Sequence, residues 1–263
     1  MVRDVDFHLG HSSNPSFGGS RYKLGGLIFP FGNYPFQKRK LSFRRRRALF
    51  PDTGTLRSAE PLRRRMSVTD VTDLYREFGE ERLPPGQTET SAFPVLDKSG
   101  TPDWDPETWS FSVRGAVAEE FDLSWEAFRE LPSETQRQDF HCVTGWSKLD
   151  CEFTGVTFPT LLEEADVDAD AVHVMFHGLD GYTTDLPLDV VNRREVLFAW
   201  DYDGEPLPRE HGGPLRVVTP HRYAYKGAKW VDGVTFLTER ERGYWEKRGY
   251  SVSANPWAEE RYS

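Results

Sequence analysis

Residues 139–148 read Asp139-Phe140-His141-Cys142-Val143-Thr144-Gly145-Trp146-Ser147-Lys148. The apolar residues at 140–143 predict a short strand, and the hydroxyls, glycine and lysine that follow predict a loop. A cysteine beside a cationic loop favours the thiolate, so Cys142 is a candidate nucleophile or metal ligand. The alternative is a buried small hydrophobic residue. The second cysteine, Cys151, lacks cationic neighbours in the sequence, and we interpret it as a packing residue.

A second informative region lies at residues 211–230. It combines the glycines of His211-Gly212-Gly213-Pro214-Leu215-Arg216 with the basic residues of Tyr225-Lys226-Gly227-Ala228-Lys229-Trp230. Glycines allow close approach of the backbone, and cations concentrated in an acidic protein indicate an anionic ligand. A solvated turn with surface ion pairs is the alternative. The glycine spacing matches neither a Walker motif nor a dinucleotide fingerprint.

Predicted strands outnumber predicted helices in the remaining sequence. The alternation at 109–115 predicts a strand with one buried face, and apolar runs predict strands at 172–176, 195–200, 215–218 and 230–237. Ser124 is a suitable N-cap for a helix over 125–131, a second capped helix is predicted over 157–165, and a short one over 70–79. The connections are too irregular for a βαβ repeat, so the predicted class is α+β with mixed β-sheets.

The net charge of the chain changes sign near residue 66. Residues 1–65 hold 14 Lys or Arg and 4 Asp or Glu, whereas residues 66–263 hold 19 and 38, which gives net charges of +10 and −19. The first segment has no helical or strand periodicity, which predicts a basic extension that is disordered or not native. We favour a native start at Met66. Residues 66–263 suit one domain with its own core.

Composition also argues against several classes of function. A domain with net charge −19 repels phosphate backbones, which disfavours nucleic-acid binding. The apolar runs are far shorter than the ~18 residues of a transmembrane segment. Two cysteines form no disulfide framework. We therefore expect a soluble, cytoplasmic protein, and the acidic excess is typical of halophilic proteins.

Taken together, these motifs resemble the sulfite oxidase superfamily of molybdopterin-dependent oxidoreductases. The small single-domain branch, which includes a methionine sulfoxide reductase catalytic subunit, is the most similar. The resemblance covers residues 70–263 and is also carried by Leu83-Pro84-Pro85-Gly86-Gln87, by residues 243–250 and by Asn255-Pro256-Trp257. It implies a sulfite oxidase-type molybdopterin-binding domain, Mo-molybdopterin as cofactor and two-electron oxygen-atom transfer.

The resemblance also implies roles for individual residues. In this family a cysteine thiolate binds molybdenum, and Cys142 is the matching residue. Arg216 matches a cofactor contact, as does the run Gly227, Ala228, Lys229, in which glycine replaces a common serine and leaves the backbone N–H as the donor. His211 matches a pterin contact. The other cofactor-binding candidates are Asp73, Arg76, His141, Thr144, Ser147, Lys148, His177, Gly178 and Lys226.

Substrate and partners are implied less directly. Sulfite oxidases bind their anionic substrate through an arginine-bearing loop after the cysteine. In this sequence Thr144-Gly145-Trp146 occupies the position of that loop. This favours a small uncharged oxo-compound such as a sulfoxide. The alternatives are a sulfite-oxidising enzyme, a non-catalytic molybdopterin-binding protein, and a hydrolase that uses Cys142 with His141 or His211. Because the sequence contains no haem motif, a separate electron-transfer partner is expected.

Overall fold

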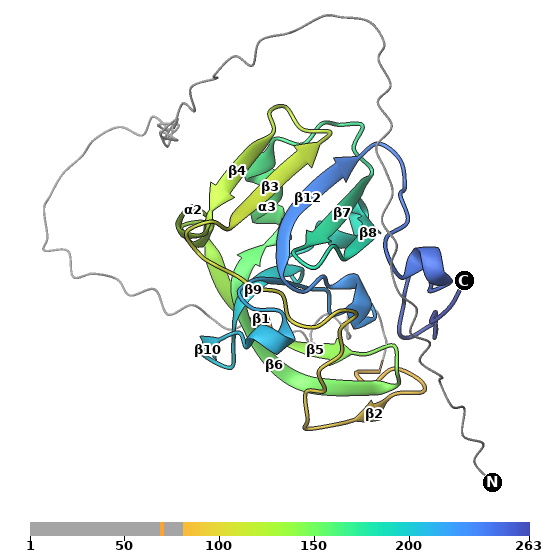
Figure 1. Ribbon diagram of the computed structural model, residues 1–263. Helices are drawn as coiled ribbons and strands as arrows, with labels where there is room; N and C mark the ends of the chain where they lie inside the picture. Colours follow the sequence, from red (N-terminus) through yellow and green to blue (C-terminus); the bar gives the residue numbers. More distant parts are fainter. Residues whose placement is uncertain (1–68, 71–80) are drawn as a thin grey trace, which may run out of the picture. The chain divides into compact units, whose positions relative to one another are not determined.

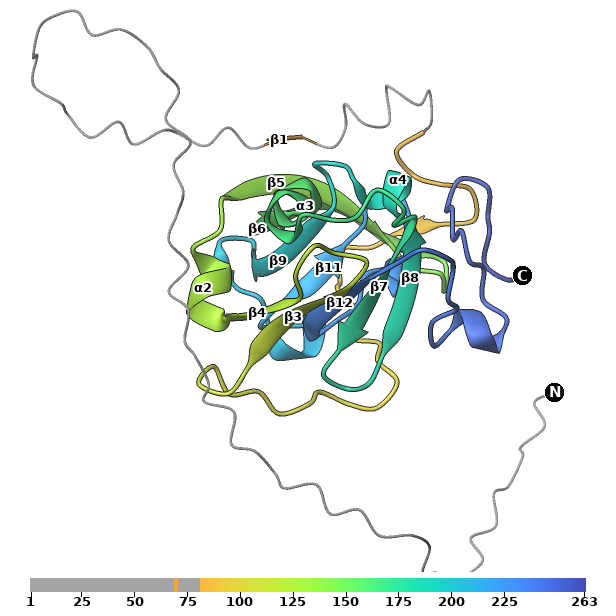
Figure 2. The ribbon, with the colours of Figure 1, turned by 90° about the horizontal axis from the view of Figure 1, so that it is seen from above.

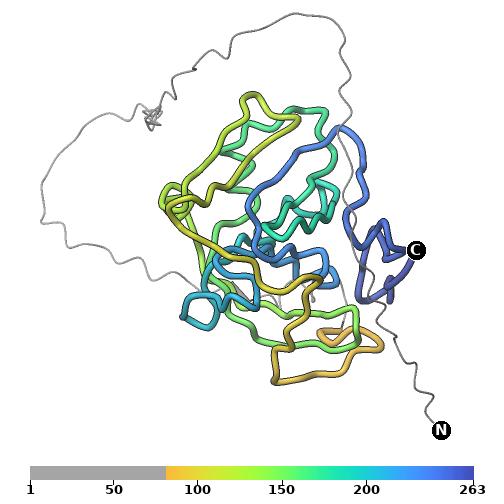
Figure 3. The backbone as a smooth tube through the Cα atoms, viewed as in Figure 1, coloured from red at the N-terminus to blue at the C-terminus, as the bar shows by residue number. Residues whose placement is uncertain are grey.

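The computed structural model describes residues 69–70 and 81–263, whose strands form two sheets (Figure 1). Figure 3 traces the path of the same backbone. The larger sheet has the order β1 (Thr69–Asp70), β5 (Ser133–His141), β6 (Trp146–Thr157), β9 (Leu197–Tyr202) and β10 (Glu205–Pro206). In addition, β11 (Arg216–Val218) pairs with β9, and β2 (Thr88–Glu89) pairs with β6. The smaller sheet has the order β4 (Phe121–Ser124), β3 (Ser110–Gly115), β12 (Val231–Leu237), β7 (His173–Gly178) and β8 (Thr183–Pro187).

Both sheets are mixed. Strand β12 runs parallel to β3 and antiparallel to β7, and the short strands β1 and β2 add parallel pairs to an otherwise antiparallel larger sheet. The helices are short: α2 (Trp125–Arg129), α3 (Phe158–Ala165), α4 (Leu188–Val191) and the 3₁₀ turns η1 (Arg209–His211), η2 (Ala224–Lys226) and η3 (Glu246–Arg248). The predicted α+β class with mixed sheets is confirmed.

Two helices begin at the predicted N-caps. The Ser124 side chain accepts a hydrogen bond from the Ala127 backbone N–H at 3.2 Å, and the Thr157 hydroxyl accepts one from the Thr160 N–H at 3.3 Å. Each bond satisfies a donor that the first helical turn leaves without a partner. Helix α2 is nevertheless shorter than predicted and ends at Arg129.

The main core lies between the two sheets (Figure 2). Phe111 of β3 and Phe176 of β7 meet Phe198 of β9, with ring centroids 5.5 and 6.0 Å apart. Phe158 at the start of α3 packs against both Phe176 and Phe198. Burying each of these rings contributes about 1.5–3 kcal/mol. The alternation predicted at 109–115 thus produces one buried face, directed at the larger sheet.

The long β5–β6 hairpin differs from the prediction, which placed only a short strand at 140–143. Strand β5 consists largely of polar residues, so it lacks the apolar alternation that identifies a half-buried strand. Its buried Gln136 and Gln138 donate instead to the Arg194 and Glu195 carbonyls, at 2.7 and 2.6 Å. Hydrogen bonds to a distant segment therefore hold a strand that local sequence does not reveal.

Several sequence-based predictions lie outside the described residues. These are the extension over 1–65, the start at Met66, and the candidates Asp73 and Arg76. Of the helix predicted over 70–79, only Asp70 is described, and it belongs to strand β1. In the described part of the chain, no helix combines the length and apolar character needed to cross a bilayer.

Candidate functional site

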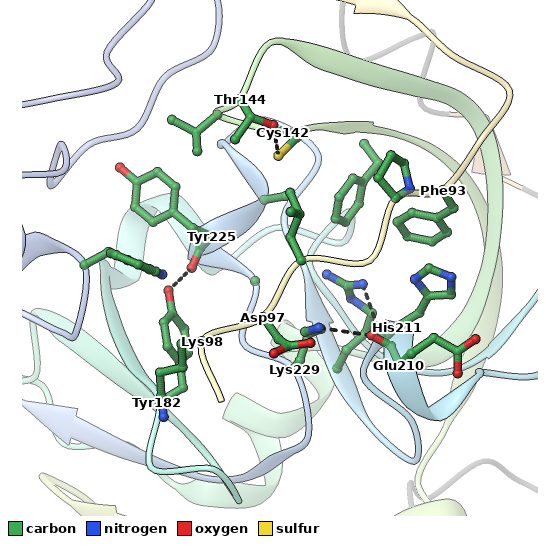
Figure 4. A pocket seen from close by; sticks show the side chains of 18 of the residues that line it. Phe93, Asp97, Lys98, Cys142, Thr144, Tyr182, Glu210, His211, Tyr225 and Lys229 are labelled. Atoms are coloured by element: carbon green, nitrogen blue, oxygen red, sulfur yellow. Dashed lines mark hydrogen bonds between the residues drawn. The ribbon is translucent and has the colours of Figure 1, made fainter. Parts of the chain in front are cut away.

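A cavity of about 260 Å³ opens where the β5–β6 turn approaches the segments around residues 211–230. Cys142 and Thr144 line one side of it, and His211, Glu210 and Lys229 line the opposite side (Figure 4). Aromatic side chains from several segments complete the wall: Phe93, Phe140, Trp146, Tyr182, Tyr225, Trp230, Trp245 and Tyr250. The structure thus brings the two informative regions of the sequence to a single cavity.

Cys142 directly follows strand β5, in the turn of the hairpin. Its backbone N–H donates to the Trp146 carbonyl at 2.8 Å, and its carbonyl accepts from the Gly145 N–H at 3.0 Å. Gly145 has φ +99°, a conformation that glycine adopts without steric cost. The Cys142 sulfur lies 3.1 Å from the Thr144 hydroxyl and lines the cavity (Figure 4). It is therefore placed to bind a group inside the cavity.

Cys151 has the environment of a packing residue, as predicted. It is fully buried in a cluster with Phe153, Leu197 and Ala199. Burial raises the pKa of its thiol to about 12, because a thiolate is poorly solvated there. Cys151 is consequently unreactive near neutral pH.

Arg216 places a buried guanidinium at the cavity. It is 3% exposed, donates to the His211 carbonyl at 2.7 Å and lies 4.8 Å from the centre of the Phe140 ring. Burial lowers its pKa to about 10. Among the described residues no carboxylate forms an ion pair with it. A buried cation without a counter-charge favours an anionic ligand.

Lys229 adds a second cation to the same wall. Its ammonium donates to the Glu210 carbonyl at 3.0 Å and lies 4.3 Å from the Trp230 ring centre. Burial, together with the nearby Arg216 charge, lowers its pKa to about 8. Lys229 is thus still mostly protonated at neutral pH and available to an anion.

His211 lines the cavity as a neutral ring. Burial lowers its pKa, and the charges of Arg216 and Lys229 lower it further. The ring stacks on Phe93, with centroids 4.1 Å apart and planes inclined by 11°. A flat, neutral aromatic surface of this kind suits contact with a heterocyclic ring.

Gly227 also lines the cavity, but its backbone N–H is already used. That N–H donates to the Ala224 carbonyl at 3.0 Å and closes η2, so the donor expected for a ligand is occupied. A Cβ at this position would lie 2.4 Å from the Val217 carbonyl oxygen, so the local backbone path requires glycine. The adjacent Ala228 is fully buried in the core.

Lys226 is not brought to the cavity. Its ammonium is completely buried, lies 2.5 Å from a Glu246 carboxylate oxygen and donates to the Asp185 carbonyl at 2.9 Å. These contacts direct the side chain away from the predicted ligand and make Lys226 an internal anchor for η2.

Five further candidates lie outside the cavity wall. His141 contacts the Ser147 hydroxyl at 2.8 Å behind Cys142, and Lys148 donates to the Ser91 carbonyl at 2.8 Å. His177 contacts the Thr235 hydroxyl at 2.9 Å in the smaller sheet. Next to it, a Cβ on Gly178 would lie 2.7 Å from the Lys229 carbonyl oxygen, so this glycine allows the close approach of that backbone. The structure therefore does not bring these five candidates to the cavity.

Sequence reasoning missed the segment 93–98, which lies across the cavity and includes Phe93, Asp97 and Lys98. The ammonium of Lys98 donates to the Asp180 carbonyl at 2.6 Å, which fixes one end of the segment, and the Phe93–His211 stack fixes the other. Pro94 interrupts this irregular stretch, and no local pattern marks its role.

This chain is similar to several known proteins. Residues 98–245 match the family described as the oxidoreductase molybdopterin binding domain. An uncharacterized oxidoreductase of Bacillus subtilis, YuiH, is 41% identical over 183 residues, which are 69% of this chain and 92% of that protein. MsrP of Gluconobacter oxydans, a protein-methionine-sulfoxide reductase catalytic subunit, is 28% identical over 212 residues. This match covers 72% of this chain and 64% of MsrP.

A solved structure supports the fold. The sulfane dehydrogenase SoxCD from Paracoccus pantotrophus matches with a TM-score of 0.51 and 20% identity, over 57% of this chain and 43% of that one. At this identity the likeness concerns the fold alone. Together with the family match, it confirms the predicted sulfite oxidase-type molybdopterin-binding domain.

Proposed function

Because the chain belongs to the family of oxidoreductase molybdopterin-binding domains, we propose that Cys142 binds molybdenum in a molybdopterin cofactor and that the enzyme transfers an oxygen atom to or from a small uncharged compound, such as a sulfoxide. Family membership makes the chain an oxidoreductase. The metal, the substrate class and the site residues are our proposal.

The observation that carries this proposal is a cavity lined by one thiol and by three cations, of which Lys98 is paired with Asp180. Cys142, Arg216 and Lys229 line it together, and Arg216 is buried without a carboxylate among the described residues. A ligand with a metal at one end and a phosphate at the other suits this arrangement, because soft sulfur binds molybdenum and cations bind phosphate.

The donor set fits a metal that brings further ligands of its own. Within residues 69–70 and 81–263, no group of three or more His, Cys, Asp or Glu side chains is placed to hold an ion. A metal at Cys142 must therefore take its other ligands from a bound group. The dithiolene sulfurs of molybdopterin are such ligands, and the bound molybdenum would supply the two-electron oxygen-atom chemistry.

The protein residues would bind and orient this cofactor. Arg216 has five N–H donors, of which one is given to the His211 carbonyl and one to the Val217 carbonyl, and Lys229 adds an ammonium. Both suit the phosphate. The His211 ring, held by its stack on Phe93, offers a flat surface to the pterin. In this arrangement the cations act on the cofactor rather than on the substrate.

The substrate side of the cavity is apolar and aromatic. Trp146 lines it two residues after Thr144 and stacks on Phe140 with planes inclined by 20°. An uncharged substrate loses less hydration free energy than sulfite when it moves from water into a cavity with such a wall. The name of the similar MsrP, a methionine-sulfoxide reductase, supports a sulfoxide, although this chain spans only 64% of that relative.

We also propose that a separate protein exchanges electrons with this chain and that the enzyme works in the cytoplasm. The name of the similar MsrP describes a catalytic subunit, which supports electron transfer by a separate protein. The cytoplasmic location is supported by the two cysteines, Cys142 and Cys151, which are both free thiols, as is usual in a reducing compartment.

A substrate screen tests the proposed reaction. The full chain, purified with its metal, would be assayed with a reduced dye and dimethyl sulfoxide or methionine sulfoxide, and separately with an oxidised dye and sulfite. We expect sulfoxide reduction and little sulfite oxidation. Sulfite oxidation alone would overturn the substrate class, and bound molybdenum without turnover in either assay would indicate a non-catalytic binding protein.

A further inference from the structure

Both ends of the described domain meet at the turn that holds Cys142. The Gln87 side-chain amide donates to the Cys142 carbonyl at 3.2 Å, and the Thr88 N–H donates to the Gly145 carbonyl at 2.9 Å. From the opposite end of the chain, the Arg261 guanidinium donates to the Val143 carbonyl. Three carbonyls of this turn thus receive donors from segments that are remote in the sequence.

Arg261 reaches two segments at once. While one of its terminal nitrogens donates to Val143, the other donates to the Gly86 carbonyl at 3.3 Å. The guanidinium also lies 5.1 Å from the centre of the Tyr223 ring and 3.9 Å from a Glu259 oxygen. Its side chain is 20% exposed, so water competes only partly for these bonds. The planar fork of arginine can hold two carbonyls in a fixed relation, which a lysine cannot.

The C-terminal segment is itself fixed in place. The Arg261 carbonyl accepts from the Ser251 N–H at 3.1 Å, and Tyr262 forms an isolated bridge with Tyr250. In addition, the Trp257 indole donates to the Glu81 carbonyl at 2.6 Å, which links the C-terminal segment to the segment that begins at residue 81. Arg261 is therefore attached to a supported segment and not to a free end.

Gly86 allows Arg261 to come this close. It has φ +67°, and a Cβ there would lie 2.5 Å from a Glu259 carboxylate oxygen and 3.2 Å from the Arg261 nitrogen. The Pro84-Pro85-Gly86-Gln87 segment thus contacts both Arg261 and the turn that holds Cys142. It presents the Gly86 carbonyl to Arg261 and the Gln87 amide to Cys142.

We propose that Arg261 is a positioning residue for Cys142. By holding the Val143 carbonyl, it fixes the turn so that the Cys142 sulfur lines the cavity at the place where it would bind the metal. This role rests on the proposed function, because it concerns the same cysteine. Hydrogen bonds with a charged partner contribute about 1.5–3 kcal/mol, which corresponds to about a 10- to 100-fold change in how often the turn opens.

The first test uses the thiol and requires no metal. The full chain would be produced in cells unable to make molybdopterin, and the rate of Cys142 alkylation by iodoacetamide would be measured at neutral pH. Cys151 is buried with a raised pKa and reacts slowly. We expect Arg261→Gln to increase the Cys142 rate about tenfold or more, because the residue is only 7% exposed when the turn is held.

Two further variants sharpen this test. Arg261→Lys keeps the charge but cannot hold both carbonyls, so we expect a rate between those of wild type and Arg261→Gln. Arg242→Gln removes the same charge from an exposed side chain for which the structure gives no contact among the described residues, and we expect the wild-type rate.

The second readout is the visible absorption of the metal-loaded protein, which reports on sulfur bound to the metal. We expect Arg261→Gln to shift or weaken the sulfur-to-metal band while Arg242→Gln leaves it unchanged. A purely structural role would lower the unfolding temperature without moving the band or the alkylation rate.

The proposal is overturned if Arg261→Gln, studied well below its unfolding temperature, keeps the wild-type alkylation rate. Should that variant not fold, a wild-type rate in Arg261→Lys overturns it equally. Failure of the proposed function gives a different result, namely wild-type protein without molybdenum but with the predicted order of alkylation rates.

Discussion

Arg216 and Lys226 are both buried cations, ten positions apart in the sequence, yet their surroundings are opposite. Lys226 lies 2.5 Å from Glu246 and 3.8 Å from Asp185, so the protein supplies its counter-charges. Arg216 donates to a backbone carbonyl and lines the cavity, and among the described residues it has no carboxylate partner.

The difference distinguishes a cation with internal partners from one that we propose binds the cofactor. Removing a charge from water costs several kcal/mol unless an opposite charge compensates for it. For Lys226 the compensation is internal, and the ion pair fixes η2 against the segment after β12. For Arg216, the phosphate of the proposed cofactor would supply the compensation. A positive charge in the sequence therefore indicates a ligand only when the fold leaves that charge without a partner.

The largest expected effect is on stability, at Lys226. The substitution Lys226→Met leaves Glu246 buried without its partner, and we expect a loss of about 3–5 kcal/mol in the free energy of unfolding. Urea unfolding of the full chain measures it.

The double variant Lys226→Met with Glu246→Gln is the control. It removes both charges of the pair, so we expect it to recover a large part of the lost stability. If Lys226→Met unfolds like wild type but no longer holds cofactor, Lys226 is a binding residue and the contrast with Arg216 fails.

The next effect is on cofactor binding, at Arg216. The substitution Arg216→Gln retains a donor for the His211 carbonyl but removes the charge. Because this buried charge has no carboxylate partner among the described residues, we expect the free energy of unfolding of the cofactor-free chain to stay the same or to increase.

Cofactor affinity should respond far more strongly. Loss of one charged hydrogen bond weakens binding by about 10- to 100-fold. The pterin retained after dilution and gel filtration measures this change. An Arg216→Gln protein that is strongly destabilised yet holds cofactor normally would reverse the assignments of the two cations.

The smallest effect is a pH dependence that Lys229 gives to cofactor binding. Its pKa in the free protein is lowered to about 8, and a bound phosphate would raise it. The protonated form is thus fully present at lower pH and is lost as the pH rises through 8, so affinity should fall by roughly severalfold between pH 7 and pH 9. In Lys229→Gln this decrease should disappear. A wild-type affinity that rises over the same range would contradict the role of Lys229.

Local signals predicted part of this structure. The alternation around Phe111 and the capped helices after Ser124 and Thr157 depend on neighbouring residues, and the structure confirms them. The strand predicted over 140–143 ends earlier, at His141, so Cys142 lies in the turn that follows it. The cations concentrated near residue 216 predicted a binding region, and two of them, Arg216 and Lys229, line the cavity.

What the sequence could not show depends on distant partners. Lys226 and Lys229 look equivalent in the sequence, and only the position of Glu246 in the fold distinguishes them. The polar strand β5 is held by the Arg194 and Glu195 carbonyls, and Phe93 reaches His211 from more than a hundred positions away. None of these pairings has a local pattern.

The metal and pterin content of two cysteine variants tests the central claim most directly. Wild type should contain about one molybdenum per chain, with visible absorption and turnover. Cys142→Ser should lose that absorption and all activity, whereas Cys151→Ser should retain both, since its sulfur is enclosed by Phe153 and Leu197. A Cys142→Ser protein that retains the wild-type spectrum, or equal losses from the two substitutions, would contradict molybdenum binding at Cys142.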